Sequence, residues 1–116
     1  MTWKSARFVA DQYLQKLNLP PRLDRAVIQL SDYESDEDLY FLKSSNEWGL
    51  AFHRMVNEAL ARALRKRGAK IAFVLIRMKD YFAWLAKFDL PNTPANRAQF
   101  IGWSTAPEPK PQPIKK

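Results

Sequence analysis

Apolar residues recur at helical spacing in several stretches of this chain, and shorter stretches between them have the composition of β-strands. The first periodic stretch, residues 5–17, predicts an amphipathic helix that packs on its Phe8 and Leu14 side, with Ser5 as its N-cap. The sequence Asn-Leu-Pro-Pro at residues 18–21 should end this helix, because proline cannot continue it.

Two short apolar segments follow. Residues 24–30 are rich in β-branched side chains, and residues 39–42 form a second apolar run. We interpret them as two strands joined by a bend at residues 31–38. Because this bend contains neither Gly nor Pro, the alternative is that both segments are helical, which points toward an all-α protein.

The strongest helical pattern lies in the middle of the chain. Ser45 or Asn46 can cap this helix, and Glu47 suits the positive end of its dipole. The apolar positions form a broad face, so we expect contact with more than one neighbour. The main stripe contains Trp48, Phe52, Met55, Val56, Ala59 and Ala63, and the flanking row contains Leu50, His53, Asn57, Leu60 and Leu64. The predicted outer side contains Arg54, Glu58, Arg62 and Arg65.

The segment after this helix is the most apolar in the chain. Residues 69–77 are apolar at both alternating sets of positions, which predicts a central strand covered on both faces. Residues 79–88 return to helical spacing. An alternative joins residues 70–88 into one buried helix, but the β-branched side chains of Val74 and Ile76 favour the strand.

One more short helix is predicted near the C-terminus. Pro91 ends the preceding helix, and Thr93 followed by Pro94 is typical of an N-cap and the first helical position. Residues 94–103 should therefore be helical. The side chains expected to face inward are Phe100, Ile101 and Trp103.

Prolines at alternate positions in residues 107–113 predict an extended, disordered, basic tail over residues 104–116. The remaining residues 1–103 fit one domain, since a chain of 116 residues with 47% hydrophobic content can bury a single core. The predicted fold class is α+β, a small single domain in the order α-β-β-α-β-α-α. The chain has no apolar run long enough to span a bilayer and no signal-peptide core, so we expect a cytoplasmic protein without membrane contact.

The charge distribution is uneven. The formal net charge is +7, yet five of the twelve acids cluster within residues 32–38. The rest of the chain contains seven acids and nineteen bases, which gives it a net charge of +12. Such a surface attracts polyanions, although the same charge also keeps a small protein soluble.

A dense group of bases marks the end of the central helix. Bases offset the dipole at a helix C-terminus, but one or two are enough for that role. Several on one surface can neutralise phosphates, which predicts contact with nucleic acid. The group contains Arg62, Arg65, Lys66, Arg67 and Lys70, and Arg77 and Lys79 can extend it.

Catalytic and metal-binding candidates are few, because the chain has one histidine and no cysteine. We interpret His53 as a structural residue at the margin of the central helix, hydrogen-bonded to a neighbour. The acidic run resembles a calcium loop only in spacing: the sixth-place glycine is missing, and Lys43 stands where a glutamate belongs. A solvated bend explains it better. We predict no catalytic residue, metal or cofactor, and lean against an enzyme.

Two further patterns bear on DNA binding. Residues 79–89 and 94–103 loosely imitate a helix-turn-helix whose second helix carries side-chain types that read bases, namely Asn96, Arg97 and Gln99. Residues 64–85 resemble the basic-turn, apolar-strand, acidic-Tyr-helix segment of the Phd/YefM antitoxins. That family has a strand before the basic turn, whereas residues 59–64 look helical here. The resemblance implies a dimeric DNA-binding autorepressor whose tail occupies a toxin.

The preferred prediction is a small basic, non-catalytic, nucleic-acid-associated or regulatory protein that contacts phosphates through the cationic group. The alternative is a protein-interaction module, a homo-oligomer or a small subunit of a larger assembly. The aromatic content of 13% and a Pro-rich tail able to lie in a partner's groove favour the alternative. An exposed apolar patch or a self-complementary surface near Trp48 and Trp103 would support it.

Overall fold

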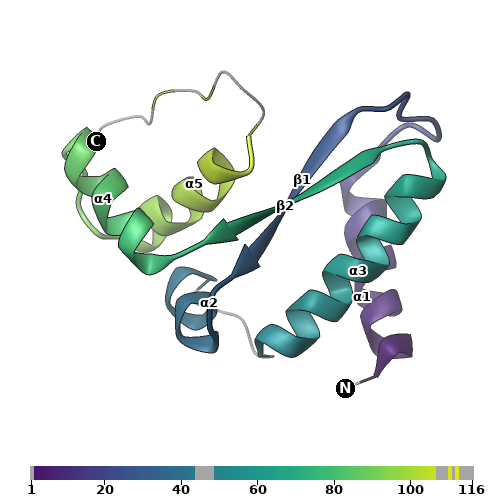
Figure 1. Ribbon diagram of the computed structural model, residues 1–116, viewed down its shortest axis with the longest axis horizontal. Coiled ribbons are helices and arrows are strands. Elements are labelled where there is room, and N and C mark those ends of the chain that lie inside the picture. The colour runs from purple at the N-terminus through teal and green to yellow at the C-terminus, as the bar shows by residue number, and fades with distance from the viewer. Residues whose placement is uncertain (1, 44–48, 107–109, 111, 113–116) are drawn as a thin grey trace.

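The computed structural model describes residues 2–43, 49–106, 110 and 112, and it confirms an α+β fold (Figure 1). Five helices surround a two-stranded sheet in the described residues. The observed order differs from the predicted one at a single element, the second predicted strand. The elements are α1 (Trp3–Leu17), β1 (Val27–Tyr33), α2 (Asp36–Lys43), α3 (Leu50–Lys66), β2 (Lys70–Ile76), α4 (Met78–Phe88) and α5 (Pro94–Ser104).

The two strands pair in parallel, from Val27 opposite Lys70 to Tyr33 opposite Ile76. A parallel pair needs a long connection, and α2 with α3 supplies it. Partner residues point to the same face of the sheet, and successive residues point to opposite faces. The register therefore decides which side chains share each core.

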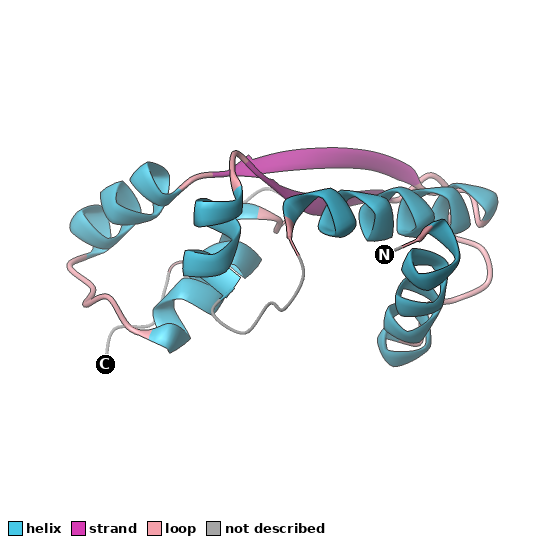
Figure 2. Cartoon of the chain, turned by 90° about the horizontal axis from the view of Figure 1, so that it is seen from below, coloured by secondary structure: helices cyan, strands magenta, loops and turns pink. Residues whose placement is uncertain are grey.

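Two cores lie on opposite faces of this sheet, one toward each end. Ile28, Leu30 and Ile71 share one face and pack with buried residues of α1 and α3. Tyr33 and Ile76 share the other face and pack with α2, α4 and α5. Figure 2 shows α1 and α3 toward one end of the strands and the other three helices toward the other end. The sheet is thus the element that joins two helical groups.

The prediction that residues 69–77 form a central strand is wrong. Among the described residues β2 pairs only with β1, so it is an edge strand. Phe73 and Leu75 lie on the face shared with Ile71 but beyond the helices that cover it, and they are 47% and 48% exposed. The run is apolar on both faces because each face is covered at a different end. The strand itself is confirmed, and neither the continuous helix over residues 70–88 nor the all-α alternative is observed.

The second predicted strand, residues 39–42, is also wrong, because this segment belongs to helix α2. The Ser35 hydroxyl accepts a hydrogen bond from the Asp38 backbone N–H at 3.2 Å and donates to the Asp38 carboxylate at 2.8 Å. Such a reciprocal pair stabilises a helix start, and acids in the first turn suit the dipole. Leu39 and Leu42, three residues apart, are both buried on one helix face.

The first predicted strand both begins and ends three residues later than expected, as Val27–Tyr33. Asp24 and Arg25 have φ values of 45° and 64°, which are incompatible with a strand. Ser31 and Asp32 lie in β1, not in the predicted bend. Side chains of α3 bind the Ser31 carbonyl and the Asp32 carboxylate, which allows these polar residues to belong to the strand.

Helix α1 is confirmed, but its cap and its buried face differ from the prediction. Thr2, not Ser5, is the N-cap, and its side chain accepts from the Ser5 backbone N–H. The buried positions are Ala6, Ala10 and Leu14, whereas Phe8 is 64% exposed. Small side chains four residues apart let α1 approach α3 closely.

Helix α3 buries the predicted flanking row and, from the main stripe, Phe52, Val56 and Ala59, because α1 and the sheet cover different sides of it. Met55 and Ala63 of the main stripe are half-buried. Its observed N-cap is Gly49. The predictions for Ser45, Asn46, Glu47 and Trp48 lie outside the described residues. Helices α4 and α5 occur where predicted, and Thr93 caps α5 through a hydrogen bond from the Asn96 backbone N–H at 3.1 Å.

The core around α4 and α5 contains many aromatic side chains. The Trp84 ring lies 5.3 Å from the Phe100 ring, which in turn stacks on Trp103 at 6.2 Å. The described part of the C-terminal segment contacts this core, since the Lys110 ammonium lies 4.6 Å from the Trp103 ring and donates to the Ser104 carbonyl at 3.2 Å. Trp103 is therefore mainly a packing residue.

Candidate nucleic-acid interface

Two chain segments that are distant in sequence form one end of the molecule. The Leu23 N–H donates to the Arg67 carbonyl at 2.7 Å, and the Arg25 N–H donates to the Gly68 carbonyl at 2.9 Å. In the other direction, the Lys70 N–H donates to the Ala26 carbonyl at 2.9 Å. These three hydrogen bonds fix the segment before β1 against the turn that joins α3 to β2.

The backbone at this end needs unusual conformations. Gly68 has a φ of 95°, which ordinary side chains rarely adopt. Asp24 and Arg25 are non-glycine residues at positive φ, a conformation that costs about 1 kcal/mol or more per residue. The hydrogen bonds to the α3–β2 turn hold them there. These backbone hydrogen bonds therefore fix the positions of the two segments relative to one another.

We call this surface the basic end. Four of its bases were predicted from the sequence, and Arg22 and Arg25 were missed. No local signal joins these two arginines to a cluster some 40 residues later; only the pairing of the segments does. Within the described part of the chain, none of the six bases has an ion pair within 4.0 Å. The basic end consists of Arg22, Arg25, Arg65, Lys66, Arg67 and Lys70.

The other predicted bases lie apart from the basic end. Arg62 pairs with Glu58 at 3.5 Å, and its guanidinium lies 4.7 Å from the Trp3 ring. Arg77 and Lys79 follow the far end of β2, about 20 Å away for a seven-residue strand. Arg77 is also paired with acids, and a hydrogen bond from its side chain to the Asp80 carboxylate raises its pKa.

Polar side chains of α5 form hydrogen bonds with the loop that precedes this helix. The Asn96 side chain donates to the Pro91 carbonyl at 2.7 Å, and Arg97 donates to the Asn92 side chain at 2.8 Å. The Gln99 carbonyl oxygen is buried. These contacts leave the predicted base-reading set facing the protein, so the helix-turn-helix interpretation is not supported.

The acidic segment is not the solvated bend that was predicted, because its carboxylates cap helices. Asp36 accepts from the Leu50 N–H at 2.7 Å at the start of α3, and Asp38 accepts from the Met78 N–H at 3.0 Å at the start of α4. Asp32 forms an ion pair with Arg54 at 2.9 Å. Across residues 2–43, 49–106, 110 and 112, no three acidic or histidine side chains gather in a way that could hold a metal ion.

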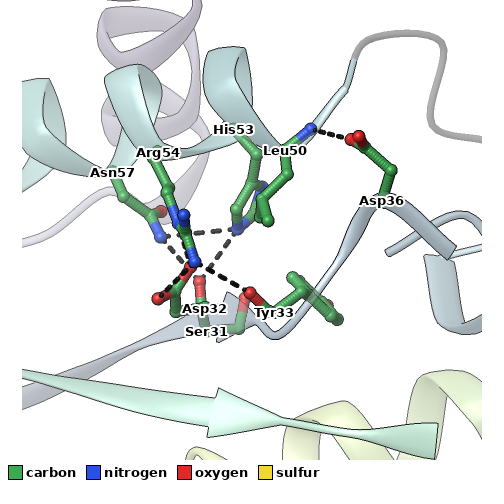
Figure 3. Close-up of polar contacts among 8 residues, drawn as sticks. All are labelled: Ser31, Asp32, Tyr33, Asp36, Leu50, His53, Arg54 and Asn57. Carbon is green, nitrogen blue, oxygen red and sulfur yellow. Dashed lines mark hydrogen bonds and ion pairs between the residues drawn. The ribbon is translucent and has the colours of Figure 1, made fainter. Parts of the chain in front are cut away.

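His53 and Asn57 close the outer edge of β1 (Figure 3). The His53 Nε2–H donates to the Ser31 carbonyl at 2.9 Å, and the Asn57 amide donates to the same oxygen at 2.6 Å. Arg54 donates to the Tyr33 carbonyl at 3.0 Å. Burial lowers the pKa of His53, which favours the neutral imidazole. The predicted structural role of His53 agrees with this geometry.

The comparison with protein-family models finds no matching family, and the comparisons with curated proteins and with solved structures find no significant match. The resemblance to the Phd/YefM antitoxins therefore gains no support. The fold also differs from that expectation, because residues 59–64 belong to α3, so a helix and not a strand directly precedes the basic turn. None of the described helices combines the length and the apolar character needed to cross a bilayer.

Proposed function

We propose that this protein binds nucleic acid without catalysis, through phosphate contacts made by the basic end. The observation that carries the proposal is that six bases from two segments, fixed together by backbone hydrogen bonds, have no carboxylate partner among the described residues. Like charges placed close together repel one another, and a bound anion reduces this repulsion. The backbone of a nucleic acid supplies several phosphates at once.

The chemistry of the six side chains favours phosphates over a single carboxylate ligand. Four are arginines, whose planar guanidinium groups can bind phosphate oxygens in a bidentate manner. One acid, Asp24, lies among them, and it is exposed. Backbone contacts of this kind carry no sequence information, so we expect weak discrimination between sequences. A cytoplasmic location is part of the same proposal.

Charge reversal at the basic end tests the proposal. The Arg65→Glu/Lys66→Glu variant should lose affinity about tenfold or more for both duplex and single-stranded probes, because two phosphate contacts become repulsive. Both side chains are exposed, so the fold should be unchanged. Gel-shift titrations with mixed-sequence probes give the affinity, and circular dichroism checks the fold.

The matched control is Lys79→Glu/Lys87→Glu, which changes the net charge by the same amount on exposed residues of α4. Its affinity should fall much less than that of the basic-end variant. Equal losses in the two variants would mean that only total charge matters, and unchanged binding in the Arg65/Lys66 variant would refute the proposal.

A protein-interaction module is a second candidate function. It is favoured by Phe73 and Leu75, two large apolar side chains about half exposed on one strand. Phe8 on α1 and Phe82 on α4 are exposed as well, but they lie on separate helices. Isolated exposed apolar residues are common, whereas two on the same edge strand need an explanation.

A further inference from the structure

The outer edges of β1 and β2 differ in whether their outward backbone groups have hydrogen-bond partners. Side chains of α3 satisfy two outward carbonyls in the C-terminal half of β1, because His53 and Asn57 bind Ser31 and Arg54 binds Tyr33. The β1 edge is therefore blocked in that half. These contacts also establish that odd-numbered residues of β1 direct their backbone groups away from β2.

The backbone groups of β2 follow from this alternation. In a parallel pair, each residue that bonds to the partner strand alternates with one whose N–H and C=O point outward. The Lys70 N–H bonds to β1 through the Ala26 carbonyl, so Lys70, Ala72 and Val74 face inward. Ile71, Phe73 and Leu75 then direct their backbone groups outward. Within the described ranges these groups have no hydrogen-bond partner.

β2 lacks the features that usually protect an edge strand. Natural edges carry prolines, inward-pointing charges or bulges that discourage pairing. The only charge in β2 is Lys70 at its start, and the remaining residues Ile71–Ile76 are uncharged and lack proline. The same strand exposes Phe73 and Leu75. The outer edge of β2 is thus apolar and unprotected, whereas side chains of α3 bind the edge of β1. This difference indicates that β2 pairs with another chain.

We propose that β2 pairs in antiparallel fashion with β2 of a second copy of this chain, across a two-fold axis at Phe73. Phe73 is the midpoint of the strand, so this register pairs all seven residues. Phe73 then lies opposite its own copy, Ile71 opposite Leu75 and Ala72 opposite Val74, all apolar pairs. The outcome is a four-stranded sheet in which the outward N–H and C=O groups of Ile71, Phe73 and Leu75 are paired.

The charge distribution favours this direction of pairing. The basic end lies at the N-terminal end of β2, whereas Glu34 and the acidic first turn of α2 lie at the other end of the sheet. Antiparallel pairing brings the basic end of one copy to the end of the other copy that carries these acids, where Arg77 is already paired with Glu34 and Asp80. It also keeps the two Lys70 residues about 20 Å apart, whereas a parallel arrangement would place the two basic ends side by side.

Mass measurement of the intact protein tests the pairing. Sedimentation or light scattering over a range of micromolar concentrations should give twice the chain mass of 13.5 kDa. The Phe73→Lys variant should be monomeric, because it places two like charges opposite each other. The Phe8→Lys variant, which changes an exposed phenylalanine on α1, should remain dimeric. A monomeric natural protein, or a dimeric Phe73→Lys variant, would overturn the proposal.

Cysteine crosslinking tests the register, and the natural chain contains no cysteine to interfere. The Phe73→Cys variant should form a disulfide-linked dimer on mild oxidation, because directly opposed residues have Cα atoms about 5.5 Å apart. The Lys70→Cys variant should not, since its two copies are too distant. Crosslinking through residue 70 but not through residue 73 would contradict the antiparallel register, as would equal crosslinking of a Phe8→Cys variant. A different protein bound to this edge would leave all these variants monomeric and uncrosslinked.

Discussion

Raising the pH from 10 to 12 is expected to destabilise this protein by about 2 kcal/mol through Tyr33 alone. The Tyr33 side chain is fully buried, and its hydroxyl has no hydrogen-bond partner in the described structure. Burial raises the pKa of Tyr33 from 10.0 to about 12, and the nearby Ser31 side chain opposes this shift only in part. Each pKa unit corresponds to about 1.36 kcal/mol.

The direction of this effect follows from the two protonation equilibria. Above pH 10 the unfolded chain loses the phenolic proton, whereas the folded protein keeps it until about pH 12. The unfolded state is therefore favoured progressively as the pH rises, and the full contribution to stability is present below pH 10. Burial also raises the pKa of Tyr81, which adds an effect of the same sign.

Urea denaturation of the natural protein and of the Tyr33→Phe variant, at several pH values from 9 to 12, measures this contribution. The variant should lose the Tyr33 part of the alkaline destabilisation. Near neutral pH it should be about as stable as the natural protein, because the lost hydroxyl had no partner. A variant with the same pH dependence as the natural protein would contradict the assignment.

The Asp38→Ala substitution should lower the free energy of unfolding by about 3 kcal/mol. One Asp38 oxygen accepts from the Ser35 hydroxyl at the start of α2, and the other accepts from the Met78 N–H at the start of α4. Hydrogen bonds to a charged group contribute about 1.5 to 3 kcal/mol each, and the half-buried Met78 N–H would lose its acceptor. Loss of this residue therefore weakens two helices that share one core.

Chemical denaturation monitored by circular dichroism measures the change. The Glu37→Ala variant is the matched control, because Glu37 is an exposed acid of the same helix turn, and its effect should stay within about 0.5 kcal/mol. The Asp38→Asn variant keeps an acceptor oxygen and should fall between the two. Similar losses in the Asp38→Ala and Glu37→Ala variants would show that the charge of the turn, and not its hydrogen bonds, stabilises the helices.

The sequence predicted the elements that have strong local signals. Helix α3 has a long apolar period, and α5 begins at a Thr-Pro pair that fixes its first turn. Helix α2 was predicted only as the alternative for residues 39–42, because its capping pair, Ser35 and Asp38, lies within an acidic run that resembles a loop. The true boundary of β1 could not be found locally, since the Ser31 carbonyl is satisfied by His53 and Asn57 of a distant helix.

The candidate interface was predicted only in part for a similar reason. Arg65, Lys66, Arg67 and Lys70 are neighbours in sequence and in space. Arg22 and Arg25 join them through tertiary hydrogen bonds that leave no pattern in the sequence, so these two were missed. In contrast, the large distance between Arg77 and the basic end could be predicted, because an extended strand separates Lys70 from Arg77.

The salt dependence of nucleic-acid binding tests the phosphate-contact account most directly. The logarithm of the affinity should fall linearly with the logarithm of the salt concentration, by about 0.9 per phosphate neutralised on duplex DNA. The Arg65→Gln/Lys66→Gln variant should show a slope smaller by about 1.8, because two phosphate contacts are lost. Identical slopes for the natural protein and this variant, or binding that does not respond to salt, would contradict the account.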